Sequence, residues 1–123
     1  MYDDNNVFAK IMRKEIPAEI IAENEYAMSF HNIAPYTDVH ALVIPRGKYV
    51  DILDFATHAS AAEQAGFWRL FAETAAALGI SGNFNAAANA GADAPLSKQT
   101  IFHFHIHLMA GKLRPGKPAP HDF

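Results

Sequence analysis

Three histidines alternate with apolar residues near the end of the chain. In an extended strand, successive side chains point to opposite faces, so His103, His105 and His107 would share one face. Imidazole can act as nucleophile, acid, base or metal ligand near neutral pH. The row therefore predicts a chemical site anchored by apolar packing on the other face, which would be formed by Phe102, Phe104, Ile106 and Leu108.

Three interpretations of this histidine row are open. A neutral imidazole can attack phosphorus and form a covalent phospho-imidazole, which water then breaks. The same spacing on a strand can hold Zn²⁺ or another transition ion, with Asp93 and His40 as candidate further ligands. A polar sheet face without chemistry is the third interpretation, and three histidines in strict alternation make it the least expected of the three.

A sheet must hold this row, and the sequence predicts four strands besides that of the histidines. A short helix comes first, capped by Asn5 or Asn6 and ended by Pro17. Apolar and β-branched runs between turn residues then predict the strands. We expect these strands at 18–23, 26–31, 39–44 and 84–89, with the histidine strand inside the stretch 99–109.

One long helix is expected between the third and fourth strands. Ser60 and Glu63 have the spacing of a capping box, and apolar residues then recur at helical spacing as far as Gly79. These features predict a helix over 57–78. The order of elements indicates an α+β fold in which this helix covers one face of an antiparallel sheet.

The composition bounds the class of protein. The 123 residues fit a single domain (1–123), and residues 112–123, rich in proline, are expected to form a C-terminal tail. The net charge of −3 argues against a broad nucleic-acid surface, and no apolar run is long enough to span a membrane. The lack of cysteine excludes disulfides and thiol catalysis. With no signal pattern at the start, a cytoplasmic location is the default expectation.

The segment 103–109 matches the histidine triad signature, His-φ-His-φ-His-φ-φ with φ apolar, at every position. Other stretches match in order and with suitable spacing, so the resemblance covers roughly residues 6–111. The sequence thus resembles the histidine triad (HIT) family, with the nucleotide-binding, purine nucleoside phosphoramidase branch as the nearest. The further matching stretches are 7–18, 30–35, 40–45, 89–93 and Gln99.

The resemblance implies a HIT-like fold and a role for each matching residue. The fold would be a five-stranded antiparallel sheet with one long and one short helix. His105 would be the nucleophile that becomes nucleotidylated, His107 and His40 would contact phosphate oxygens, and His103 would steady the nucleophile. Asn89, Gln99 and Thr100 would lie near the phosphate. The pocket for base and ribose would be formed by Val7, Phe8, Ile11, Phe30, His31, Asn32, Ile33 and Leu42.

The activity implied is hydrolysis of purine nucleoside 5′-phosphoramidates or related nucleotidyl esters, by a homodimer that needs neither metal nor cofactor. A nucleotide-binding module with little turnover and a dinucleoside polyphosphate hydrolase are the alternatives. Two departures from the branch bear on the choice. Asn32 stands where Asp is usual, and an amide offers fewer acceptors to ribose hydroxyls. The 94–98 segment is longer than usual, with Lys98 in place of glycine.

Overall fold

The protein is built on a single sheet of five antiparallel strands, with helices on both sides. The computed structural model describes residues 1–116. The helices are α1 (Val7–Met12), α2 (Ile52–His58) and α3 (Ala61–Ala77). The strands are β1 (Ile20–Glu23), β2 (Ala27–His31), β3 (Thr37–Pro45), β4 (Phe84–Ala87) and β5 (Ile106–Leu113).

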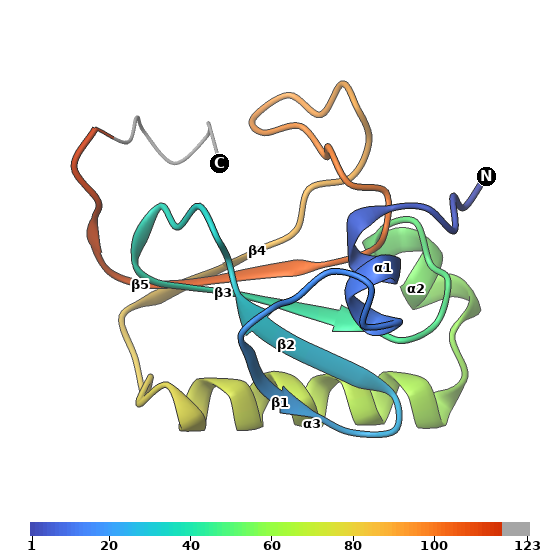
Figure 1. Cartoon of the computed structure of the whole chain (residues 1–123), viewed down its shortest axis with the longest axis horizontal. Coiled ribbons are helices and arrows are strands. Elements are labelled where there is room, and N and C mark those ends of the chain that lie inside the picture. Colours follow the sequence, from blue (N-terminus) through green and yellow to red (C-terminus); the bar gives the residue numbers. More distant parts are fainter. Residues whose placement is uncertain (117–123) are drawn as a thin grey trace.

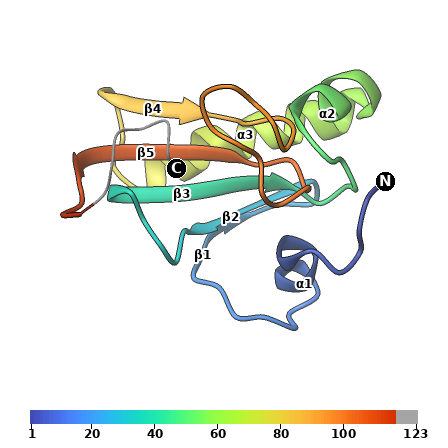
Figure 2. The ribbon, with the colours of Figure 1, turned by 90° about the horizontal axis from the view of Figure 1, so that it is seen from above.

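The strand order β1-β2-β3-β5-β4 places the histidine strand beside β3. Figure 2 shows β3 and β5 running side by side through the middle of the sheet. In their register Leu42 lies opposite His107, and His40 lies opposite Met109. Because directly opposed residues of antiparallel strands point to the same face, His40, Leu42 and His107 belong to one face.

The two faces of the sheet carry separate apolar clusters. Figure 1 shows α3 running beneath the strands, with α1 on the side away from it. Between α3 and the sheet, Phe67 and Leu70 of α3 pack with Phe55 of α2 and with Phe104. The buried hydroxyl of Thr74 on α3 adds a polar contact to this cluster, because it is hydrogen-bonded to Ser29 of β2. The other cluster joins α1 to the sheet and contains Phe8, Ile11, Met28, Phe30, Leu42 and Ile44.

The predicted long helix is divided into two. Ser60 caps α3, and its side chain and that of Glu63 form the predicted capping box. The preceding residue, Ala59, is extended (ψ 146°), so the chain turns here and α2 is a separate helix begun by Asp51. The prediction of a helix starting at residue 57 was therefore wrong, while the end near Leu78 is confirmed. Asn6 caps α1 as expected.

The five-stranded antiparallel sheet is confirmed, but the bounds of its strands differ from the predicted ones, most of all at the start of β5. β5 begins at Ile106 rather than before His103, because pairing with β3 stops at Val43, opposite Ile106. β4 ends at Ala87 rather than 89, opposite His107. Hence His103 and His105 precede the hydrogen-bonded ladder. At its other end β5 continues through Leu113, into the predicted tail; residues 117–123 of that tail lie outside the described part.

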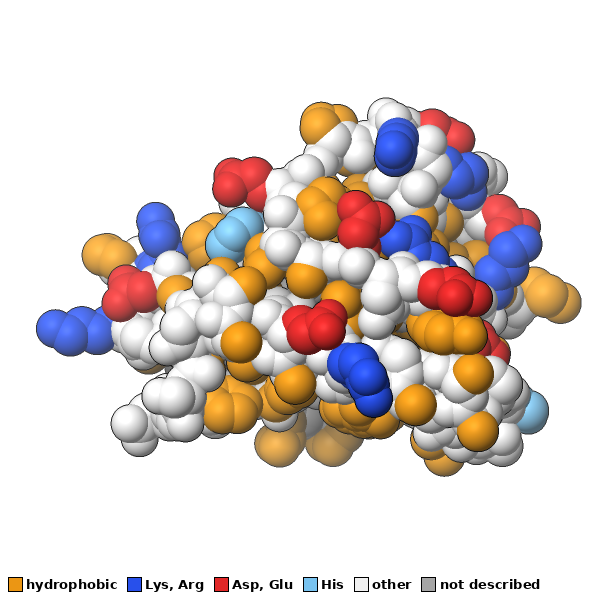
Figure 3. Space-filling model, turned by 90° about the horizontal axis from the view of Figure 1, so that it is seen from below, with side chains coloured by type: hydrophobic (Ala, Val, Ile, Leu, Met, Phe, Trp, Pro, Cys, Tyr) orange, Lys and Arg blue, Asp and Glu red, His pale blue; other side chains and the backbone are white. Residues whose placement is uncertain are grey.

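The surface mixes both signs of charge. On the face seen in Figure 3, acidic and basic side chains intermingle among hydrophobic ones rather than forming a continuous basic area. Proteins that bind nucleic acids present basic patches or stripes, and this face of the described residues has none. Within the same part of the chain, no helix is both long and apolar enough to cross a membrane.

Candidate active site

Four histidines lie in a row on the face of the sheet that carries α1. Ring centroids of His105 and His107 are 5.0 Å apart, and those of His107 and His40 are 5.2 Å apart. Phe8 of α1 packs edge-on against His105 at 4.9 Å and against His103 at 6.2 Å. The structure thus brings together all four histidines predicted to be catalytic, with an aromatic ring from α1 at one end.

His103 is fully buried, and both of its ring nitrogens have partners. Nε2 lies 2.8 Å from the carbonyl oxygen of Pro45, and Nδ1 lies 2.6 Å from the hydroxyl of Tyr2. A carbonyl oxygen only accepts, so Nε2 carries the proton and Nδ1 accepts from the Tyr2 O–H. Burial lowers the pKa of His103 from 6.5 to about 4, so the ring is neutral at pH 7.

His105 has one nitrogen committed and one with its lone pair available. Nδ1 lies 2.7 Å from the main-chain carbonyl oxygen of His103 and therefore donates its proton there. In a neutral ring, Nε2 then carries no proton. Burial lowers the pKa of His105, which favours the neutral form. A neutral imidazole with a fixed tautomer is what nucleophilic attack requires.

His40 and His107 form a directed pair across β3 and β5. The main-chain N–H of Tyr36 donates to Nδ1 of His40, so a neutral His40 carries its proton on Nε2. That nitrogen lies 2.9 Å from Nδ1 of His107 and donates to it. A neutral His107 consequently carries its proton on Nε2. Burial, together with His105 and His40, lowers the pKa of His107 to about 3.

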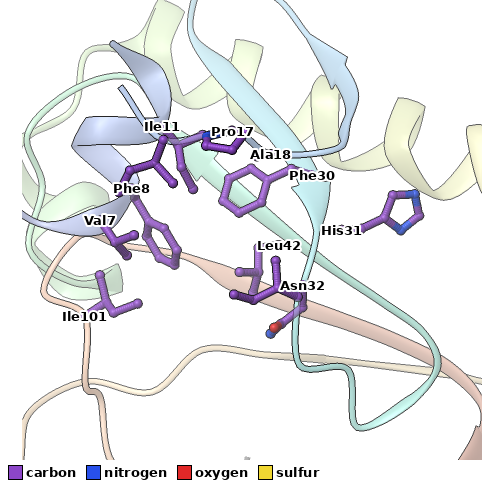
Figure 4. Close-up of a pocket in the computed structure, with 12 residues that line it drawn as sticks. Val7, Phe8, Ile11, Pro17, Ala18, Phe30, His31, Asn32, Leu42 and Ile101 are labelled. Atoms are coloured by element: carbon purple, nitrogen blue, oxygen red, sulfur yellow. The ribbon is translucent and has the colours of Figure 1, made fainter. Parts of the chain in front are cut away.

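An apolar pocket of about 190 Å³ opens beside the row. Figure 4 shows Phe8, Phe30 and Leu42 around a common space, with the ring of His31 directed away from them. Asn32 connects pocket and row, because its Nδ2 lies 3.4 Å from Nε2 of His40. The lining includes all eight residues predicted for base and ribose: Val7, Phe8, Ile11, Phe30, His31, Asn32, Ile33 and Leu42.

The three residues predicted near the phosphate are not in the pocket lining. Asn89 is half-buried in the segment after β4, and Thr100 is exposed. Gln99 is buried, and its amide is used to brace the loop: Oε1 accepts from the N–H of Gly91, while Nε2 donates to the carbonyls of Val50 and Ile101. The side chain of Gln99 therefore shapes the loop before the triad rather than presenting a donor to a ligand.

Several residues of the site were not predicted from the sequence. Tyr2, which bonds His103, lies 101 residues away from it, and no local pattern marks that distance. Tyr36 contributes its main-chain N–H, which any residue other than proline can do. Four further pocket residues are apolar or proline and come from the segment after α1 and from the loop before the triad, namely Ile16, Pro17, Ala18 and Ile101.

The metal interpretation finds no ligand set in the described part of the chain. Within residues 1–116 no three His, Cys, Asp or Glu side chains are grouped so as to hold a metal ion. Asp93, the carboxylate considered as a further ligand, lies in the exposed loop after β4. The hydrogen bond between His40 and His107 occupies Nε2 of His40 and Nδ1 of His107.

Comparison with known proteins gives a consistent result. The model of the HIT domain family matches residues 13–113. An uncharacterized 13.2 kDa HIT-like protein of Azospirillum brasilense is 45% identical over 112 residues, which are 90% of this chain and 89% of that protein. A similar protein of Rickettsia prowazekii is 42% identical over 91% of this chain and 92% of its own. The solved structure of a HIT family hydrolase from Clostridium thermocellum matches with a TM-score of 0.78 at 28% identity, covering 96% of this chain and 98% of that one.

Proposed function

Because the chain belongs to the HIT domain family, we propose that it is a hydrolase of purine nucleoside 5′-phosphoramidates or related nucleotidyl esters. One observation carries this proposal. Nδ1 of His105 donates to the carbonyl of His103 at 2.7 Å, which leaves the lone pair of Nε2 to attack phosphorus. The likeness to a HIT family hydrolase supports the reaction class. We propose a purine base because the sequence resembles the purine nucleoside phosphoramidase branch of the family.

The reaction proceeds in two displacements at the α-phosphorus. Nε2 of His105 forms a bond to phosphorus, the bond to the leaving nitrogen or oxygen breaks, and the leaving group takes up a proton. Water then attacks the nucleotidyl-histidine, and the phosphorus–nitrogen bond breaks with its electron pair returning to Nε2. Over both steps one water is consumed: its oxygen ends on phosphorus, and one of its hydrogens balances the proton taken by the leaving group.

The neighbouring histidines support the charge that develops on phosphate. His107 carries its proton on Nε2, and a donor so placed can hydrogen-bond a phosphate oxygen. The low pKa values of His103 and His107 describe the protein without a ligand. An approaching phosphate raises the pKa of a nearby imidazole because it stabilises the charged form. Binding the substrate would thus create the positive charge where the transition state needs it.

The apolar pocket is suited to the nucleoside. Its walls of Phe8, Phe30 and Leu42 are buried apolar side chains that can cover a flat base. Asn32 stands at the end of the pocket next to His40, between the places for base and phosphate. Its Oδ1 accepts from the N–H of Ala34, which orients the amide. A nucleoside monophosphate could therefore lie with its base among the aromatic rings and its phosphorus at the row.

A homodimer is part of the proposal. β4 is the last strand on its side of the sheet, and an unpaired strand edge can pair with a second copy of the chain. Phe84 on β4 and Trp68 on α3 are 41% and 46% exposed, and aromatic side chains are enriched in interfaces. Sedimentation of wild type and of Phe84→Lys tests whether the chain forms a dimer through β4.

The cysteine-free chain also fits a cytoplasmic location, which cell fractionation tests.

The experiment that tests the activity compares wild type with His105→Ala. Wild type should hydrolyse adenosine 5′-phosphoramidate, in the presence of a chelator as well as without it, whereas the variant should bind adenosine monophosphate but not turn over. His58→Ala is the matched control, since His58 is an exposed histidine on α2 bonded to Asp54. Turnover retained in His105→Ala would refute the mechanism. Binding without turnover in wild type would favour the alternative, a nucleotide-binding module.

A further inference from the structure

The ring of Tyr2 stands against the first histidine of the triad. Its hydroxyl lies 2.6 Å from Nδ1 of His103, and the two rings meet edge-on with centroids 5.5 Å apart. With Nε2 donating to Pro45, the Tyr2 hydroxyl completes the hydrogen bonding of a ring that has no exposed surface. A buried polar nitrogen needs such a partner, so this bond is part of what holds His103 in place.

This bond matters because the sheet does not hold this part of the triad. β5 begins at Ile106, after both His103 and His105. Between the two histidines, the N–H of Phe104 donates to the carbonyl of Tyr49 at 2.7 Å. Within residues 1–116, the hydrogen bonds of His103 itself are those of its ring and the one that its carbonyl accepts from His105. The peptide group that carries this carbonyl is therefore held on one side by the Phe104 bond and on the other by the ring of His103.

The segment that carries Tyr2 is itself anchored to the fold. A guanidinium nitrogen of Arg13 donates to the main-chain carbonyl of Asp4 at 2.8 Å, and Nζ of Lys48 lies 2.9 Å from the Asp4 carboxylate. Asn6, the cap of α1, donates through its amide to the carbonyl of Asp3. These bonds on both sides of the turn after Tyr2 limit where its ring can go, so its contact with His103 is a built feature of the site.

We propose, on the basis of the proposed function, that Tyr2 is a positioning residue for the nucleophile. Its hydroxyl fixes the ring of His103, and the carbonyl of His103 in turn sets the direction of the His105 ring. Tyr2 acts without touching the substrate. Because its O–H donates to the lone pair of Nδ1, which protonation would occupy, this bond also favours the neutral form of His103. Removing the hydroxyl should therefore loosen His105 and ease the protonation of His103.

The test is Tyr2→Phe, which keeps the ring and removes the hydroxyl. Loss of the bond should lower kcat about tenfold while KM changes less than about twofold, because a misdirected nucleophile affects the chemical step more than binding. ¹⁵N NMR of the histidine rings gives a second readout. In wild type His103 should stay neutral down to about pH 5, whereas in the variant it should begin to take up a proton at higher pH. Tyr49→Phe is the control, since it also loses a tyrosine hydrogen bond, to Glu63.

The outcomes separate this inference from the proposed function. An unchanged kcat in Tyr2→Phe overturns the inference, and so does a reduced kcat with an unchanged His103 titration. An equal loss of kcat in Tyr49→Phe overturns it too, because the effect would then be general. If wild type shows no turnover, the proposed function fails, and the NMR arm decides alone: unaltered His103 and His105 signals in Tyr2→Phe overturn the inference, and altered signals at both rings support it.

Discussion

Nε2 of His40 lies 2.9 Å from Nδ1 of His107, across the two central strands of the sheet. The direction of this bond is set from outside the pair, because the main-chain N–H of Tyr36 occupies the other nitrogen of His40. His105 is directed in the same way by the carbonyl of His103. In their neutral forms the rings of the row therefore carry their protons on defined nitrogens, and the proposed chemistry depends on this order.

Replacing His40 by alanine tests the directed pair. His107 would lose the donor to its Nδ1, so the tautomer that places a proton on Nε2 would no longer be favoured. We expect kcat/KM to fall by about tenfold or more, which corresponds to one directed hydrogen bond in the transition state. Steady-state kinetics measures this, with His58→Ala as control. Equal kinetic constants for His40→Ala and wild type would contradict the directed pair.

Stability should fall as the pH is lowered from 7.5 to 5. The folded protein holds His103 and His107 at pKa values of about 4 and about 3, below the ordinary 6.5. Below pH 6.5 the unfolded chain therefore binds protons that the folded chain does not, and each histidine costs about 2 kcal/mol at pH 5. Carboxylates stay charged over this range. Urea unfolding at the two pH values measures the loss; a free energy of unfolding that is equal or higher at pH 5 would contradict it.

Asn32→Asp should raise the affinity for ribonucleotides. A carboxylate at this position, in the pocket lining and beside His40, accepts hydrogen bonds from both ribose hydroxyls, while the amide offers one acceptor atom. One added hydrogen bond predicts a gain of about fivefold for adenosine monophosphate. Titration calorimetry with the 2′-deoxy nucleotide provides the comparison, which should show a smaller gain. An equal gain, or none for either ligand, would speak against a ribose contact at Asn32.

Thr74→Val should weaken the fold and leave catalysis intact. The Thr74 hydroxyl is fully buried, 2.7 Å from the hydroxyl of Ser29, on the side of the sheet away from the pocket. The isosteric change leaves Ser29 without this partner and should cost about 1–3 kcal/mol. The double variant with Ser29→Ala should regain part of the loss, since no polar group is then stranded. Urea unfolding and kcat measured together check both parts; a lower kcat in the still-folded variant would be the contrary result.

The sequence predicted the parts of this structure that depend on local pattern. Alternation at 103–107 was enough to place the histidine rings on one face. The Ser60–Glu63 spacing identified the capping box of α3, although the helix itself was predicted to begin at residue 57. The break before Ser60 was missed because the periodicity of the apolar residues does not show where a helix stops and another begins. The start of β5 was missed because a strand ends where its partner leaves it, here at Val43.

The pocket and the hydrogen bonds of the histidine row could not be predicted from local sequence patterns. The eight pocket residues followed from the family resemblance, since the packing of α1 on β2 and β3 is not visible in any one segment. Gln99 was placed near the phosphate for the same reason, yet its amide is bonded to the main chain of its own loop and of Val50. Tyr2 had no signal at all, because its contact with His103 exists only in the folded chain.

The most direct test of the central claim is to trap the nucleotidylated enzyme. Wild type mixed with adenosine 5′-phosphoramidate, quenched during turnover and kept alkaline to preserve the phosphorus–nitrogen bond, would be digested and examined by mass spectrometry. The account predicts one adenylylated residue, His105, on the peptide that also contains His103 and His107, and no adduct in His105→Ala. An adduct on a different residue, or turnover at full rate with no adduct at any time of quenching, would contradict it.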